Sequence, residues 1–163
     1  MVSDNAEAVR QLAGQAHRVG RVSGREPWRV ALRWISRGRL GEPRGRPVAP
    51  ELSTPWQDTM SGERPGWRER AAILDGQPAF AVDYQVCRRC QLGWVEQPYT
   101  DPDLQGCGLA SAGLAALRIE HPGLSWHTLG GHFADSQAFW TAVGTGVPGG
   151  YEQRPLCPHV RPG

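Results

Sequence analysis

Cys87 and Cys90 are separated by two residues, a spacing that predicts metal chemistry. A gap of two lets both thiolates bind one tetrahedral zinc ion from a tight turn. One such pair supplies only two ligands, and the other two could come from Cys157 and His159 in the C-terminal segment LCPHV. A Zn²⁺ site of three cysteines and one histidine is closed, with no position left for a substrate, so we expect it to be structural.

Other interpretations of the cysteines stay open. The two pairs could be free thiols, or Cys87 and Cys90 could form a redox pair, although no helix is predicted to start there as it does in thioredoxin-type pairs. The N-terminal segment MVSDNAEAVRQLAG lacks the basic-then-apolar layout of a secretory signal, so we expect a cytoplasmic protein with reduced thiols. No apolar run approaches the roughly 18 residues of a membrane span. Cys107 is expected to fill space in a loop.

The segment QGCGLA, from Gln105 to Ala110, points to a different chemistry. Glycines let the backbone come close to a phosphate, and the unpaired N–H groups at the start of a following helix attract negative charge. A strand is predicted before this segment and a helix after it, which is the context that such a loop needs. The pattern predicts a pyrophosphate-binding loop, while a structural glycine turn before a packing helix is the simpler alternative.

The same segment fits the pattern Q/R-x-x-G-x-G/A and resembles the acyl-CoA loop of the GNAT (N-acetyltransferase) superfamily. The resemblance covers about residues 78–154, including the aromatic strand 94–100, the DPD turn and the FWxxVG helix end at 139–144. It implies an α/β (α+β) fold with a mixed, mostly antiparallel sheet, splayed central strands and flanking helices. It also implies acetyl transfer from acetyl-CoA to an amine acceptor by direct attack. The segment VCRRCQLGW similarly resembles the knuckles of zinc ribbons.

The GNAT resemblance assigns a set of residues to the acyl-CoA. Those around the pyrophosphate would be Gln105, Gly106, Cys107, Gly108, Ala110 and Ser111. The end of the preceding strand would pair with the pantetheine arm through its backbone, at Pro98, Tyr99 and Thr100. Because Pro98 has no N–H to donate, it must occupy an edge or a bulge in the sheet.

The catalytic residues of the family carry over less completely. In GNAT enzymes a carboxylate or a water chain removes a proton from the attacking amine, and a tyrosine often protonates the leaving thiolate. The position of that tyrosine is Trp140 here, and an indole is not a proton donor near neutral pH. Other donors are Tyr99, Tyr151, Ser136, His132 and His127. We single out Glu96 as a general base, and Tyr99 and His132 as further catalytic candidates; a strand carboxylate is more often solvated, and His127 is expected to be a core histidine.

Hydrophobic periodicity places regular elements around these motifs. Helices are predicted over 5–19, 107–119 and 134–144, and strands over 28–36, 78–86, 91–99, 124–130 and 149–156. Strands 78–86 and 91–99 are expected to form an antiparallel hairpin whose turn holds Cys87 and Cys90. At 163 residues the chain is expected to be one domain. Its parts are a basic front (1–40), a Pro/Gly-rich loop that would shape the acceptor pocket (41–70), and an acyl-CoA-binding core with a metal-binding tail (71–163).

All 18 basic residues are arginines, and the predicted strand over 28–36 is basic on one face. Arg29, Arg33 and the neighbouring Arg37 project together, and such a patch could bind the phosphates of RNA or another polyanion, or simply be solvated. Two functions are therefore alternatives to the predicted N-acyltransferase activity. One is a catalytically silent GNAT-like module that binds acyl-CoA or a macromolecule, and the other is an acyltransferase that uses the basic front to engage a polyanion.

Overall fold

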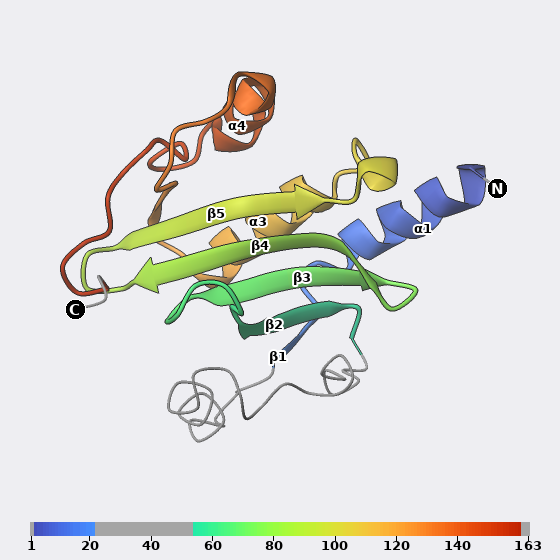
Figure 1. Cartoon of the computed structure of the whole chain (residues 1–163), viewed down its shortest axis with the longest axis horizontal. Helices are drawn as coiled ribbons and strands as arrows, with labels where there is room; N and C mark the ends of the chain where they lie inside the picture. Colours follow the sequence, from blue (N-terminus) through green and yellow to red (C-terminus); the bar gives the residue numbers. More distant parts are fainter. Residues whose placement is uncertain (1, 22–53, 161–163) are drawn as a thin grey trace, which may run out of the picture.

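The computed structural model describes residues 2–21 and 54–160. The predicted strand over 28–36, with Arg29, Arg33 and Arg37, and the first part of the predicted loop over 41–70 lie outside the described residues. The described residues contain one six-stranded sheet with helices on one face and at one edge (Figure 1). The predicted α+β class, with a mixed and mostly antiparallel sheet, is confirmed.

The strands are β1 (Val19–Arg21), β2 (Trp56–Met60), β3 (Arg68–Leu74), β4 (Gln77–Cys87), β5 (Leu92–Thr100) and β6 (Ser125–His127). The α-helices are α1 (Val2–Gly14), α3 (Leu109–Glu120) and α4 (Gln137–Gly144). Two short 3-10 turns are η1 (Pro102–Leu104) and η2 (Ala134–Ser136). Strand order in the sheet follows chain order, with antiparallel pairing from β2 to β5 and parallel pairing of β1 with β2 and of β5 with β6.

The predicted hairpin is confirmed as β4 and β5, which pair antiparallel around a turn at residues 88–91. The pairing register shifts between Ala81 and Asp83, so that Val82 lies opposite both Gln97 and Pro98. Gln97 has a φ of 49°, in the left-handed region, as expected of a residue in a bulge. The prediction that Pro98 occupies an edge or a bulge is therefore correct.

β5 and β6 separate soon after they begin to pair. β6 pairs with Leu92, Gly93 and Trp94, and among the described residues the rest of β5 has no β6 partner. Gly93 makes the initial pairing possible, because a Cβ there would lie 2.7 Å from the ring of Trp126. The sheet is therefore open between the second half of β5 and the chain that follows β6.

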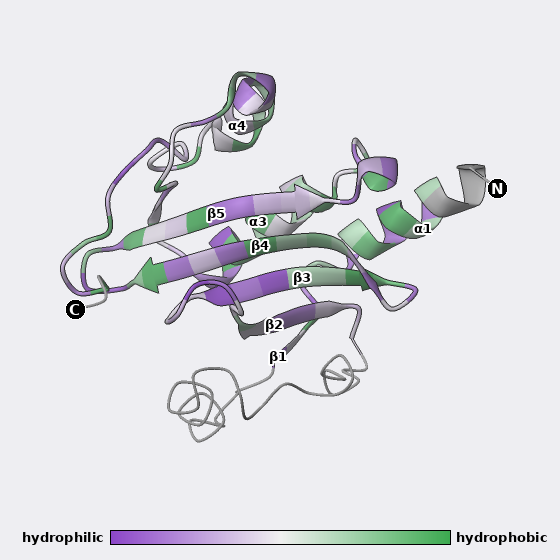
Figure 2. Ribbon diagram, viewed as in Figure 1, coloured by the Kyte–Doolittle hydropathy of each residue, from purple (hydrophilic) through white to green (hydrophobic). Residues whose placement is uncertain are grey.

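Several elements differ from the sequence predictions. The helix predicted over 5–19 ends at Gly14, and the unpredicted strand β1 begins at Val19. The strand predicted over 124–130 ends at His127. β2 lies within the predicted loop over 41–70, and β3 was not predicted at all. The inward positions of β3 are held by Arg70 and small alanines instead of large apolar residues, so the alternation that marks a strand is missing. Figure 2 shows the hydrophilic first half of β3. The predicted last strand over 149–156 is wrong: it forms a single bridge from Gln153 to Thr128, because Gly149, Gly150 and Tyr151 all have positive φ.

The main core lies between the sheet and the two helices α1 and α3, which lie behind the sheet in Figure 1. Val9 and Leu12 of α1 and Leu114 of α3 pack there against the sheet. Helix α3 approaches closely at Gly113, where a Cβ would lie 2.5 Å from the ring of Phe80. The position of α3 on the sheet is fixed by this contact.

A buried polar cluster lies at one side of this core. Asp58 of β2 is fully buried and accepts hydrogen bonds from Arg70 Nε at 3.1 Å, from Arg70 Nη2 at 2.8 Å and from the Tyr84 hydroxyl at 2.6 Å. Arg70 Nη2 also donates to Glu120 Oε2 of α3 at 2.7 Å. Burial alone would raise the pKa of Asp58, but the hydrogen bonds from Tyr84 and Arg70 hold it below its ordinary value. The cluster joins three strands to the end of α3.

Replacing the central carboxylate tests how much this cluster stabilises the fold. We expect Asp58→Asn to lower the free energy of unfolding by about 3–5 kcal/mol, because it leaves buried guanidinium charge without its partner. The contribution of Asp58 is complete above its ordinary pKa of 3.8 and is lost as pH falls through the lower folded pKa. Urea unfolding at several pH values measures both effects. The exposed turn residue Asp75 provides the control Asp75→Asn, and equal stability of the two variants would contradict the prediction.

Candidate functional site

The glycine loop has the geometry of an anion-binding loop. Gly106 and Gly108 have φ of 75° and 85°, a left-handed conformation that side chains disfavour. Gly108 is the N-cap of α3 and offers no side chain to cap the helix. The first N–H groups of a helix have no acceptor within it, so those after Gly108 are available to a ligand. Gln105 Nε2 ties the loop to the end of β5 by donating to the Thr100 carbonyl at 3.3 Å.

A cavity of about 630 Å³ lies against this loop. Its walls come from the glycine loop and the first turn of α3, the end of β5, and the residues around α4. Seven of the nine residues predicted to bind acyl-CoA line it: Pro98, Thr100, Gln105, Gly106, Gly108, Ala110 and Ser111. The other two are placed elsewhere in the described part of the chain: Tyr99 is 49% exposed outside the lining, and Cys107 packs against the core. The volume falls within the range of ligand pockets.

A second cavity of about 210 Å³ lies where β5 and β6 separate. It shares Pro98, Phe133, Ser136 and Trp140 with the larger cavity, so the two adjoin. Glu96 and His132, both predicted to be catalytic, line the smaller one. The structure therefore brings the predicted cofactor residues next to two of the three predicted catalytic residues.

The Glu96 carboxylate is held by the backbone across the opening. Its Oε1 accepts hydrogen bonds from the Leu129 N–H at 2.5 Å and the Gly130 N–H at 3.2 Å. Its Oε2 lies 3.7 Å from Arg64 Nη2. Both oxygens are engaged, so Glu96 is better suited to fixing the separated strands than to accepting a proton.

His132 is held with one ring nitrogen available. Its Nε2 lies 2.9 Å from the Tyr151 carbonyl oxygen and 3.3 Å from Thr128 Oγ1. A carbonyl can only accept, so in the neutral ring Nε2 carries the hydrogen and Nδ1 keeps its lone pair. The ring stacks on Trp140 with centroids 4.7 Å apart. Among the predicted catalytic residues, His132 is thus the one whose contacts leave a proton acceptor.

The remaining proton-donor candidates are placed as follows. Tyr151 is buried, its hydroxyl accepts a hydrogen bond from Arg118 at 2.6 Å, and burial raises its pKa. His127 is buried with Nδ1 3.1 Å from the Glu152 carbonyl, and burial lowers its pKa, as expected for a core histidine. Of these candidates, Ser136 lines both cavities.

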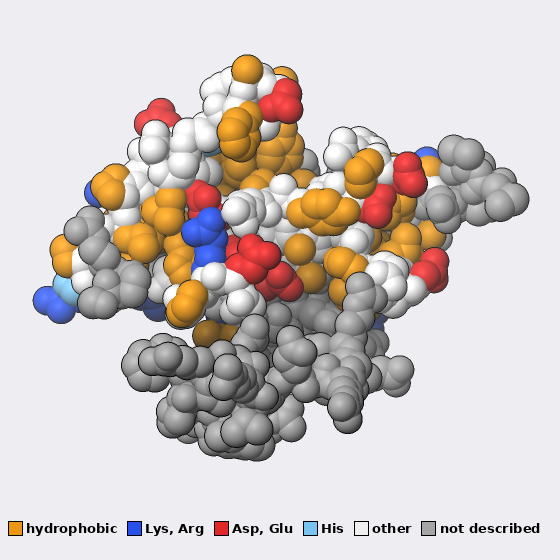
Figure 3. Space-filling model, viewed as in Figure 1, with side chains coloured by type: hydrophobic (Ala, Val, Ile, Leu, Met, Phe, Trp, Pro, Cys, Tyr) orange, Lys and Arg blue, Asp and Glu red, His pale blue; other side chains and the backbone are white. Residues whose placement is uncertain are grey.

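The front face of the sheet carries a row of carboxylates beside the smaller cavity. Glu69 pairs with Asp83 across β3 and β4, and Asp83 pairs with Glu96 across β4 and β5. Arg64 lies over the row, with Nε 3.5 Å from Asp83 Oδ2. Burial, followed by the charge of Asp83, raises the pKa of Glu69. Figure 3 shows acidic side chains gathered beside basic ones on the front of the molecule.

The cysteines predicted to bind metal do come together. One ligand atom from each of Cys87, Cys90, Cys157 and His159 lies within 4.8 Å of all the others, and Cys90 Sγ is 3.1 Å from His159 Nδ1. Figure 1 shows the C-terminal segment reaching the β4–β5 turn. Trp94 anchors that segment through a hydrogen bond from Nε1 to the Arg154 carbonyl at 3.1 Å. These four residues are close enough to hold a metal ion.

The donor set of this cluster fits a tetrahedral ion. Three sulfurs and one imidazole are ligands that Zn²⁺ accepts, and the four atoms leave no place for a substrate. Burial opposes ionisation of Cys157, but the backbone N–H of His159 and the thiols of Cys87 and Cys90 lower its pKa to about 7. Burial and the hydrogen bonds with Cys157 and Cys87 raise the pKa of Cys90 to about 11. Metal binding would therefore release protons from the cluster.

Three residues that contribute to the cavities were not assigned from the sequence. Phe133 is 80% exposed and lines both cavities, and the Leu129 and Gly130 amides hold Glu96. All three lie between β6 and η2, where the strand predicted over 124–130 has already ended at His127 and no periodicity marks which side chain faces a cavity. The only signal is the pair Gly130–Gly131, which indicates a turn.

No family model, curated protein or solved structure matches this chain. Within residues 2–21 and 54–160, no helix is long and apolar enough to cross a membrane.

Removing one ligand tests the metal cluster. We expect purified protein to contain about one zinc ion per chain and Cys157→Ser to lose most of it, because a tetrahedral site of this kind needs all four ligands. We also expect the variant to melt at a lower temperature. Elemental analysis and thermal unfolding provide the two measurements. Cys107→Ser is the matched control, since Cys107 lies outside the cluster, and equal metal content in both variants would show the ligand set to be wrong.

Proposed function

We propose that the chain is an acyl-CoA-dependent N-acyltransferase that transfers an acetyl group from acetyl-CoA to an amine, with a structural zinc ion in the cysteine–histidine cluster. The observation that carries this proposal is the cavity in which the glycine loop, the start of α3 and the open side of β5 meet. This arrangement suits a long ligand with a phosphate-rich end and an extended arm.

On the donor side, the pyrophosphate would lie on the N–H groups at the start of α3, next to Gly106 and Gly108. The pantetheine arm would run toward the opening between β5 and β6, where the β5 backbone beyond Trp94 is not paired with β6. The Pro98 bulge lies on this path and lines both cavities. The thioester would then reach the smaller cavity beside His132.

In the proposed reaction, the amine nitrogen attacks the thioester carbonyl carbon, a C–N bond forms and the C–S bond breaks. The proton lost by the nitrogen is accepted by His132 Nδ1, whose partner nitrogen is held by the Tyr151 carbonyl. A thiolate with an ordinary pKa of about 8.5 is an acceptable leaving group near neutral pH, so Trp140 in the place of the family's tyrosine does not prevent the reaction.

The acceptor would approach over the face that carries Glu69, Asp83 and Glu96. The three carboxylates outnumber the single guanidinium of Arg64 that lies over them, so the row keeps a negative charge that attracts a protonated amine. The amine must lose its proton before it attacks, and His132 lies beyond the row in the smaller cavity. The row thus supports an amine acceptor over a neutral alcohol.

A catalytically silent module that binds acyl-CoA is the second candidate function. Both oxygens of Glu96 are engaged, and Trp140 is buried beneath the His132 ring. These contacts favour a binding role if His132 does not act as a base. Because Arg29, Arg33 and Arg37 lie outside the described residues, polyanion binding through them stays a prediction.

Donor binding is tested at the N-cap of α3. We expect Gly108→Ala to weaken acetyl-CoA binding by at least about ten-fold, because an added side chain disturbs the loop where the phosphate approaches. Gly76→Ala is the matched control, since Gly76 has a φ of 75° in the β3–β4 turn and suffers similar backbone strain. Isothermal titration calorimetry measures the affinity. Equal affinities in the two variants, or no binding by the wild type, would overturn the donor assignment.

Catalysis is tested at His132. We expect His132→Gln to lower kcat by about 100-fold while leaving acetyl-CoA affinity unchanged, because only the proton acceptor is removed. Release of free thiol with a panel of amines measures turnover. Tight acetyl-CoA binding without turnover by the wild type would favour the silent module, and full activity of the variant would remove His132 from the mechanism.

A further inference from the structure

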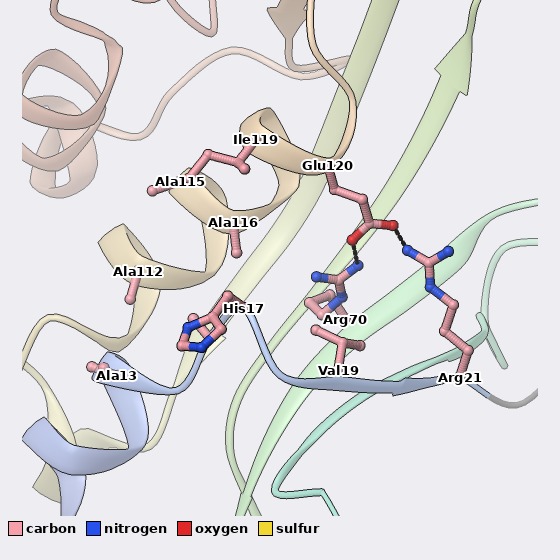
Figure 4. A pocket seen from close by; sticks show the side chains of 12 residues that line it. Ala13, His17, Val19, Arg21, Arg70, Ala112, Ala115, Ala116, Ile119 and Glu120 are labelled. Carbon is pink, nitrogen blue, oxygen red and sulfur yellow. Dashed lines mark hydrogen bonds and ion pairs between the residues drawn. The ribbon is translucent and has the colours of Figure 1, made fainter.

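A third cavity, of about 490 Å³, lies between α1 and α3 (Figure 4). It shares no lining residue with the cavities at the glycine loop or at the β5–β6 opening. Small side chains of both helices form its walls, and charged groups of β1, β3 and α3 form its far end. The proposed acyltransferase reaction uses none of these residues.

Arg70 is a buried donor at the charged end of this cavity. Its side chain is fully buried, and Nε and Nη2 are bound to Asp58 and Glu120. Nη1 is also buried but has no hydrogen-bond partner among the described residues. In Figure 4 one guanidinium nitrogen of Arg70 contacts Glu120, while another faces the side of the cavity where His17 and Ala116 lie. Buried charged donors rarely stay unpaired, so this nitrogen points to an acceptor that the described residues do not supply.

The charges around Arg70 indicate the charge of that acceptor. Three guanidinium groups, of Arg21, Arg68 and Arg70, meet only two carboxylates, of Asp58 and Glu120. The neighbouring His121 does not add to the positive charge, because burial and the nearby arginines lower its pKa. Every one of these arginines is paired, but the positive charges exceed the negative ones by one, which suits a monoanion better than a dianion.

The remaining walls indicate what the anion is attached to. Ala13, Ala112, Ala115 and Ala116 line the space between the helices, and Ile119 extends it to the surface, where it is 79% exposed. Methyl groups offer no hydrogen bonds, so they match a hydrocarbon chain and not a sugar or a peptide.

We propose that this cavity binds a small aliphatic carboxylate. The carboxylate accepts a hydrogen bond from Arg70 Nη1, and the alkyl chain lies along the alanines between α1 and α3. The inference does not depend on the acyltransferase proposal, because the two sites have no residue in common.

The test compares ligands that differ in one property each. Hexanoate, hexanol, hexylamine and inorganic phosphate are titrated separately into the full-length protein at up to about 10 mM, and binding is followed by NMR. We expect hexanoate to bind at least about ten-fold more tightly than hexanol, with shifts at the methyl groups of Ala112 and Ala116. Equal binding of hexanol and hexanoate, equal binding of phosphate, or no binding of hexanoate would overturn the proposal.

A substitution in the wall locates the binding. Ala116→Leu fills part of the cavity and is expected to weaken hexanoate at least about ten-fold. Ala8→Leu makes the same change in α1 at a half-buried position that does not line the cavity, so it should bind like the wild type. Metal content and melting temperature show that both variants fold. Shifts confined to Gly106 and Gly108, or undiminished binding by Ala116→Leu, would place the carboxylate elsewhere and contradict the assignment.

Discussion

The buried pairing of Asp58 with Arg70 and Tyr84 is the interaction on which the arrangement of the molecule depends. Its buried hydrogen bonds join β2, β3 and β4, and Arg70 extends the network to Glu120 at the end of α3. Gly113 holds the middle of the same helix against the sheet. With the end and the middle of α3 fixed, its first turn and the glycine loop are fixed as well. A polar contact far from the loop thus helps to set where an anion can bind.

The β4–β5 hairpin connects the two other features of the molecule. Cys87 ends β4 and Cys90 lies in the turn, while the far half of the hairpin carries the bulge at Pro98. The bulge lies in the part of β5 that has no β6 partner, while the C-terminal segment is held beside the hairpin by the hydrogen bond from Trp94 to the Arg154 carbonyl. Both features follow from local chemistry. Pro98 has no N–H to donate to a neighbouring strand, and Cys87 and Cys90 have two residues between them.

Several of these features could be predicted from the sequence because a local rule governs them. The Pro98 bulge follows from the missing N–H, and the hairpin follows from two alternating runs around a short turn. The cysteine–histidine cluster was predicted across about seventy residues because Cys87 and Cys90 supply only two ligands and Cys157 and His159 form a second closely spaced pair. By contrast, β3 could not be predicted, because its pattern has an arginine at a buried position. Arg70 can be buried there only because Asp58 and Glu120 accept its hydrogen bonds. The hydrogen bonds that occupy Glu96 and orient His132 depend on backbone groups of an irregular segment, which no periodicity reveals.

The order of strands in the sheet also bears on how the chain folds. From β2 to β6 each strand lies beside the strand that precedes it in the sequence, so most sheet contacts close short loops. The sheet can therefore assemble by successive addition, with each new strand finding a template already in place. The cysteine–histidine cluster is different, because its two halves are far apart in the chain. It is expected to close last, locking an assembled sheet instead of guiding its formation.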